Sequence, residues 1–298
     1  MPLPSRLIVT CTLVAAVLMI PPVTAKPDPA DAAPGSARTG AVEPTGGPTA
    51  ALPAGTTAVS GGARTAAARV GSARPRGVLA GKVVVIDPGH QLGNSRHPRQ
   101  VRRLVDAGGF RKACNTTGTQ TNSGYPEATF TFSTARHLKA RLEARGARVY
   151  LTRTRNSVKA WGPCIDVRGR FAASVHADAL VSVHADGTAS DRRGFFVIRP
   201  ADRKGWTRDI YRESRVLSLD VRAGLRGAGL DYADYVGGDG LDTRGDLGTL
   251  NWSDVPAVMV ELGNMRNRRD AARMRDARWR SGVYAEGLAD GLTRFLTR

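Results

Sequence analysis

The chain of 298 residues is poor in cysteine, aromatic residues and acidic residues. Its three cysteines include no CxxC pair, so the sequence does not predict a cysteine-ligated metal cluster. Aromatic residues make up only 6% of the chain, and the basic residues are scattered rather than interleaved with aromatics, which argues against nucleic acid as a partner. Basic residues nevertheless outnumber acidic ones by 44 to 26, and this excess favours an anionic cell surface as the partner.

Long hydrophobic runs are also missing. The apolar run at residues 7–20 is too short to span a bilayer, and it follows a positively charged residue and precedes the small-residue sequence Val-Thr-Ala at 23–25. These features predict a secretory signal peptide at residues 1–25, with no stable membrane span after its removal. Cys11 is not expected to be lipidated, because Thr10 precedes it and the apolar run continues beyond it.

Phe, Tyr and Trp are absent from residues 26–80, which are rich in Ala, Gly, Pro, Thr and Ser. Such a segment cannot bury enough apolar surface to offset its chain entropy, so it is predicted to be a disordered linker. The folded part is expected at residues 81–298, as a single α/β domain. Residues 1–80 hold seven basic and three acidic groups, so +14 of the net charge of +18 belongs to that domain.

Two cysteines remain once the predicted signal peptide is removed, Cys114 and Cys164. An even pair in an exported protein predicts a disulfide, which here would close a loop of about 50 residues and contribute up to about 4 kcal/mol. The alternative is a pair of metal ligands, which the lack of a neighbouring CxxC pair disfavours.

The first candidate site residue is His90, in the sequence VVVIDPGH. Residues 83–86 are β-branched and are followed by Pro and Gly, which predicts a buried parallel strand. A histidine just beyond the carboxyl end of such a strand lies where open α/β sheets bind ligands. The other interpretation is a solvated loop histidine. The polar, basic stretch at 91–125 has no periodicity and is predicted to be a loop.

Glu127 lies in the first turn of a helix predicted at 126–146. A carboxylate there is either a site residue or a residue that only stabilises the helix N-terminus, since the helix dipole favours negative charge at that end. The sequence VHAD then occurs twice, at 175–178 and 183–186. Only the second copy follows a predicted strand, at 179–183. His184 is therefore the candidate, while His176 and His137 are interpreted as helix residues.

A further buried strand is predicted at 257–260, with Glu261 at its carboxyl end. His90, Glu127 and His184 are the residue types of a catalytic zinc site, which leaves its fourth position for water. Glu261 would then be free to act as the general base; the alternative is a buried carboxylate paired with an arginine. The remaining elements are predicted as strands at 147–152 and 194–199 and helices at 166–174, 207–227, 270–275 and 280–296.

Four blocks of this sequence together resemble the zinc-dependent N-acetylmuramoyl-L-alanine amidases of the Amidase_3 type. They are VVVIDPGH, the helix from Glu127 leading into LEARGARVYLTRTR, VRGRFAASVHADALVSVHADG and VPAVMVELGNMRN. The resemblance covers residues 82–298 and implies a twisted, mixed, mostly parallel sheet flanked by helices. It also implies one zinc ion held by His90, Glu127 and His184, with Glu261 as the catalytic residue.

The activity implied by the resemblance is hydrolysis of the amide between N-acetylmuramic acid and the L-alanine of the peptidoglycan stem peptide, by a secreted, wall-associated protein acting on peptidoglycan and muropeptides. A zinc peptidase acting within the stem peptide and a non-catalytic wall-binding protein are the alternatives. Oligomeric state and biological role are left open by the sequence.

Two departures from the family's pattern matter. The segment between His90 and Glu127 is longer than usual and is expected to form a wall of the substrate groove. Only about ten residues separate His184 from the next strand, too few for a self-blocking helix. No repeat or wall-binding module is recognisable. Asn264 and Asn267 are expected to shape a loop rather than to react.

Overall fold

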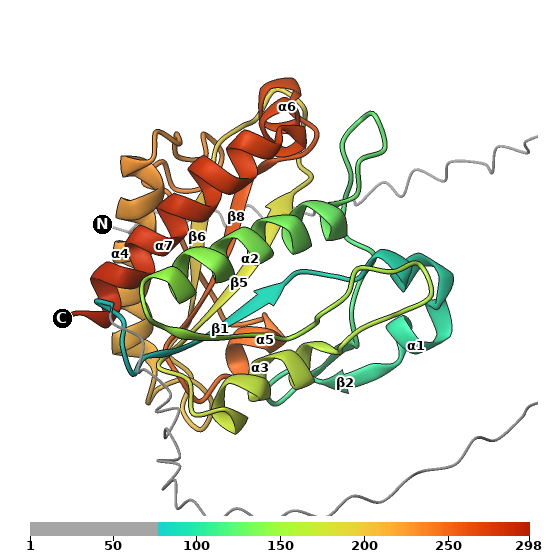
Figure 1. The fold of residues 1–298 in the computed structure, drawn as a ribbon. Helices are drawn as coiled ribbons and strands as arrows, with labels where there is room; N and C mark the ends of the chain where they lie inside the picture. The colour runs from blue at the N-terminus through green and yellow to red at the C-terminus, as the bar shows by residue number, and fades with distance from the viewer. Residues whose placement is uncertain (1–76) are drawn as a thin grey trace, which may run out of the picture. The chain divides into compact units, whose positions relative to one another are not determined.

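The computed structural model describes residues 77–298, which form a six-stranded sheet with helices on both faces (Figure 1). The predicted signal peptide at 1–25, Cys11 and residues 26–76 of the predicted linker lie outside the described residues. The last linker residues behave differently from the prediction. Leu79 is fully buried in the core, and its backbone N–H donates to the carbonyl of Arg145 at 2.8 Å.

The strand order of the sheet is β4-β1-β5-β8-β6-β7. All neighbouring pairs are parallel except β6 and β8, which are antiparallel, so the predicted mixed, mostly parallel sheet is confirmed. The strands are β1 (Val83–Pro88), β4 (Arg148–Leu151), β5 (Ala179–Asp186), β6 (Phe196–Pro200), β7 (Leu241–Arg244) and β8 (Ala257–Asn264).

Alternate residues of the central strands face two separate cores. On one side Val84, Ile86 and Val181 pack with α2 (Glu127–Ala144), α4 (Tyr211–Gly227) and α7 (Ala285–Leu296). On the other side Val85 and Leu180 pack with α3 (Ile165–Ser174) and α5 (Gly248–Asn251) (Figure 1). The continuous apolar runs in the sequence follow from this, because both faces of the sheet are covered.

The C-terminal part contains α6 (Arg268–Arg275), a π-helical turn η2 (Trp279–Tyr284) and then α7. These elements match the predicted helices closely. The predicted helix at 207–227 is shorter, since α4 begins at Tyr211. His137 lies within α2 as expected, whereas His176 lies two residues beyond the end of α3 with a φ of 51°. None of the helices in residues 77–298 is both long and apolar enough to cross a bilayer.

The stretch 91–125, which we call the insertion, was predicted to be a loop, and this was wrong. It contains η1 (Leu92–Arg96), α1 (Pro98–Arg102) and a two-stranded hairpin of β2 (Leu104–Asp106) and β3 (Arg111–Ala113). The Asp106 side chain accepts hydrogen bonds from the N–H groups of Gly108 and Gly109, which both have positive φ. Three-residue strands are too short to show an alternating pattern, so sequence periodicity could not reveal them.

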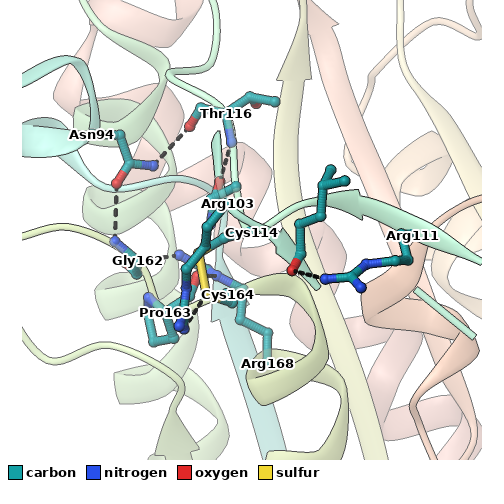
Figure 2. Close-up of a disulfide and its surroundings, with 11 residues drawn as sticks. Asn94, Arg103, Arg111, Cys114, Thr116, Gly162, Pro163, Cys164 and Arg168 are labelled. Carbon is teal, nitrogen blue, oxygen red and sulfur yellow. Dashed lines mark hydrogen bonds between the residues drawn. A yellow bond between two sulfur atoms is a disulfide. The ribbon is translucent and has the colours of Figure 1, made fainter. Parts of the chain in front are cut away.

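The insertion is joined covalently to the domain by the disulfide that the sequence predicted (Figure 2). Cys114 follows β3, and Cys164 is the N-cap residue of α3. The backbone N–H of Ile165 also donates to the Cys114 carbonyl at 2.8 Å. The hairpin is therefore held against the N-terminus of α3.

Three strands run further toward the site than predicted, and β1 continues to Pro88. β5 continues through His184 to Asp186, and β8 continues through Glu261 to Asn264. The backbone hydrogen bonds of each strand continue past the point where polar side chains begin. Because the prediction ended each strand where its apolar run ends, the predicted ends came too early. His184 and Glu261 are consequently register partners on neighbouring parallel strands.

Candidate metal centre and active site

The three predicted ligand residues converge at the carboxyl end of the sheet. Glu127 Oε1 lies 3.2 Å from His90 Nε2 and 3.0 Å from His184 Nδ1. One potential ligand atom from each residue lies within 4.8 Å of the others. Two imidazole nitrogens and one carboxylate oxygen are a donor set used by catalytic zinc sites with three protein ligands. The residues present therefore fit a zinc ion.

Each of the three candidate ligands comes from a different type of element. His184 belongs to β5, Glu127 is the first residue of α2, and His90 follows β1 through a Pro-Gly turn. Gly89 makes the approach of the two imidazoles possible, because a Cβ at this position would lie 2.4 Å from Cε1 of His184. His90 itself has a φ of 58°, in the left-handed region that non-glycine residues rarely adopt.

Part of the insertion packs directly on these ligands. The Thr116 carbonyl accepts a hydrogen bond from His90 Nδ1 at 3.1 Å, which leaves His90 Nε2 to face Glu127. The N–H of Thr119 donates to Glu127 Oε2 at 2.9 Å. Between them, Gly118 has a positive φ, and a Cβ there would lie 2.7 Å from Glu127 Oε2. Such outer hydrogen bonds orient metal ligands and fix the histidine tautomer.

Thr116 is in turn held by Asn94, which lies buried in η1 (Figure 2). The Asn94 amide donates to the Thr116 carbonyl at 2.7 Å, and its oxygen accepts from the N–H of Gly162 at 3.0 Å. Sequence reasoning missed Asn94, Thr116 and Thr119. No spacing or periodicity marks them, because Asn94 and Thr116 bond residues 22 or more positions away and Thr119 bonds Glu127 through its backbone N–H, which does not depend on residue type.

Electrostatics keep Glu127 ionised. Burial alone would raise the pKa of Glu127, but the charge of His90 and the hydrogen bonds from both imidazoles outweigh burial and hold that pKa well below its usual range. Burial lowers the pKa of His184, while for His90 the carboxylate of Glu127 overcomes burial and raises the pKa. An ionised carboxylate and a neutral imidazole at His184 are the forms that bind metals.

Glu261 lies on β8 beside His184 and lines the same cavity. Burial raises the pKa of Glu261 well above its usual value, and the negative charges of Glu127 and Asp186 raise it further. Its Oε2 is buried without a hydrogen-bond partner among the described residues. Glu261 also forms no ion pair with an arginine within residues 77–298, so the alternative of a buried carboxylate–arginine pair is not observed.

The ligands and Glu261 open into a cavity of about 370 Å³. One wall is formed by the insertion, as the sequence predicted, and the opposite wall by the segment around α5. Lys112 connects the two walls, since its Nζ donates to the Asp246 carbonyl at 2.8 Å and lies 3.2 Å from the Asp246 carboxylate. Trp252 Nε1 adds a bond to the Asp106 carbonyl at 2.7 Å.

Asn264 and Asn267 shape the neighbouring loops, as expected. Asn264 Nδ2 donates to the carbonyls of Ala189 and Arg192, both at 2.8 Å, and the Asn267 side chain caps the N-terminus of α6. Residues 187–195, which join β5 to β6, form turns and an isolated bridge.

A largely buried trio of two imidazoles and a carboxylate, next to a glutamate with a raised pKa, is typical of a metal-dependent hydrolase. The family model for N-acetylmuramoyl-L-alanine amidases of the Amidase_3 type matches residues 84–294. The chain therefore belongs to this amidase family, whose members are hydrolases.

Named relatives agree with this assignment. The chain is 41% identical over 219 residues to N-acetylmuramoyl-L-alanine amidase Rv3717 from Mycobacterium tuberculosis, covering 73% of this chain and 88% of the relative. The crystal structure of the amidase Ami1 from Mycobacterium smegmatis superposes with a TM-score of 0.69 at 36% identity, covering 73% and 98% of the two chains. For apo Ami1 from Mycobacterium abscessus the TM-score is 0.68 at 38% identity, with 73% and 99% covered.

Proposed function

We propose that this protein is a secreted, zinc-dependent N-acetylmuramoyl-L-alanine amidase that hydrolyses the amide between N-acetylmuramic acid and the L-alanine of the stem peptide. The observation that carries the proposal is the convergence of His90, Glu127 and His184 beside Glu261 in one cavity. The first three residues hold one zinc ion per chain. Glu261 is the catalytic acid and base.

The chemistry divides between the metal and the chain. When bound, zinc would act as a Lewis acid that polarises a carbonyl and lowers the pKa of water. Glu261 accepts the proton of the attacking water and returns it to the amide nitrogen as the carbon–nitrogen bond breaks. Burial and the neighbouring negative charges raise the pKa of Glu261, which makes its carboxylate a stronger proton acceptor. Thr116 and Thr119 keep His90 and Glu127 in orientation.

Location and partner follow from features outside the cavity. The signal-like sequence at 1–25, the linker composition at 26–80 and the Cys114–Cys164 disulfide support export to the cell wall. The net charge of +14 over residues 81–298 supports association with an anionic wall that contains the peptidoglycan substrate.

The test is mass spectrometry of muropeptides digested by the purified protein, together with its zinc content. We expect one zinc ion per chain and release of intact stem peptides that begin with L-alanine. Cleavage within the stem peptide would instead identify a peptidase. A zinc-loaded protein that binds muropeptides without cleaving them would identify a non-catalytic binding protein.

A further inference from the structure

Two buried arginines donate hydrogen bonds to the turn that carries His90. Arg168, from α3, is 2% exposed, and Arg153, which follows β4, is 5% exposed. Their guanidinium groups approach the turn from different segments of the chain, and together they bond its three consecutive carbonyls.

Arg168 holds the two ends of this turn. Its Nη1 donates to the Pro88 carbonyl at 2.7 Å, and its Nη2 donates to the His90 carbonyl at 2.7 Å. Nη1 also pairs with the buried carboxylate of Asp87 at 2.5 Å. Asp87 also accepts a hydrogen bond from Ser182 Oγ of β5 at 2.7 Å, which fixes the position of the turn relative to this neighbouring strand.

Arg153 connects the turn to the helix that carries Glu127. Its Nε donates to the Pro88 carbonyl at 2.9 Å, and its Nη2 donates to the Gly89 carbonyl at 3.1 Å. The same Nη2 donates to the carbonyl of Ala128 at 2.8 Å, one residue after Glu127. A single side chain thus spans the backbones of two ligand-bearing segments.

We propose that Arg153 and Arg168 are positioning residues that set the distance and orientation between His90 and Glu127 for metal binding. This inference rests on the proposed zinc site. The left-handed backbone conformation of His90 costs conformational energy and persists only where several surrounding contacts hold it in place. Guanidinium bonds to the carbonyls at positions 88, 89 and 90 provide that constraint.

The two arginines position the ligands through hydrogen-bond geometry, because their positive charges oppose metal binding. Two guanidinium groups beside a cation site repel the metal, and Arg153 forms no ion pair within the described part of the chain. Burial, followed by the positive charge of Arg168, lowers the pKa of Arg153 to about 9. A lysine at either position keeps the charge but loses the planar fork that reaches several carbonyls at once.

The experiment measures zinc affinity by chelator competition, and the absorption spectrum of the cobalt-substituted protein, for wild type, Arg153→Lys and Arg168→Lys. We expect each variant to bind zinc about 10- to 100-fold more weakly, with an altered cobalt spectrum. The control is Arg280→Lys, since half-buried Arg280 also donates to a carbonyl, that of Met274 at 2.7 Å, away from the site. The control should keep wild-type affinity and spectrum.

Outcomes separate this inference from the function on which it rests. A wild-type protein that binds no zinc would refute the proposed function. Zinc-binding wild type with unchanged affinity and cobalt spectrum in both arginine variants would overturn the inference. If those variants do not fold, Thr131→Val replaces them, because Thr131 Oγ1 is buried and donates to the same Gly89 carbonyl at 2.9 Å. A folded Thr131→Val protein should bind zinc more weakly, and unchanged affinity would again overturn the inference.

Discussion

The two sides of the metal centre are built in different ways. His184 and Glu261 are register partners on β5 and β8, so the backbone ladder of the central sheet places both. His90 and Glu127 lie at the ends of elements, and hydrogen bonds with the insertion orient both of them. A strand-borne group therefore depends on the sheet as a whole, whereas a group at an element's end depends on a few named hydrogen bonds.

The largest effect is expected on the strand side, for His184→Ala. This change removes one of the three proposed zinc ligands, so zinc content and hydrolysis should fall together. His176→Ala is the matched control, since it alters the other copy of VHAD at a position outside the site. Zinc analysis and muropeptide digestion of both variants check the prediction. Full zinc occupancy in His184→Ala would show that the ligand assignment is wrong.

Glu261→Gln should separate catalysis from metal binding. The amide keeps the size of the carboxyl but cannot accept the proton of water, so the rate should fall by roughly 10²- to 10⁴-fold. Zinc content should stay at the wild-type level, because the three proposed ligands are other residues. The measurement is the release of stem peptides under single-turnover conditions. Near wild-type hydrolysis would place the base elsewhere.

On the insertion side, removal of the disulfide should cost stability and zinc affinity together. The bridge closes a separation of 50 residues, which is worth up to about 4 kcal/mol of unfolding free energy. Cys114→Ser combined with Cys164→Ser also loosens the segment that carries Thr116 and Thr119. Urea unfolding and zinc competition test both effects. Reductant should lower the stability and zinc affinity of the wild type but leave those of the double variant unchanged. Loss of stability with unaltered zinc affinity would show that the disulfide does not influence the ligands.

The smallest effect is expected for Asp246→Asn, at the contact between the insertion and the opposite wall. Hydrogen bonds from Arg244, followed by Lys112, lower the pKa of Asp246 despite some burial. Because these side chains are well exposed, the contact should contribute at most about 1 kcal/mol.

The pH dependence of this contact has a definite sign. A lowered folded-state pKa stabilises the protein above the ordinary aspartate pKa, and this contribution disappears as the pH falls through the lowered value. The stability difference between wild type and Asp246→Asn should therefore be present at neutral pH and shrink only in strong acid. Urea unfolding across this range measures it, and a difference that grows in acid would contradict the assignment.

Sequence patterns placed five of the six strands of the sheet, missing only β7, and singled out side chains that the fold brings together at one edge. Apolar β-branched runs placed β1, β5 and β8, because a strand covered on both faces must be apolar throughout. The carboxyl ends of parallel strands share one edge, so His90, His184 and Glu261 could be assigned to it before any coordinates. The strand ends were less accurate, since ladder hydrogen bonds continue beneath polar side chains.

The sequence by itself thus predicted which residues carry the chemistry, through local periodicity and residue type. Only the tertiary structure decided how those residues are held. The hydrogen bonds between His90 and the Thr116 carbonyl, and between Arg168 and the His90 carbonyl, join positions 26 and 78 residues apart. Such bonds depend on backbone carbonyls, which every residue possesses, and therefore leave no mark on residue type or spacing. The hairpin of the insertion could not be predicted from the sequence for a related reason. A disulfide and contacts with α3 and α5 stabilise its strands, which are too short to show an alternating pattern.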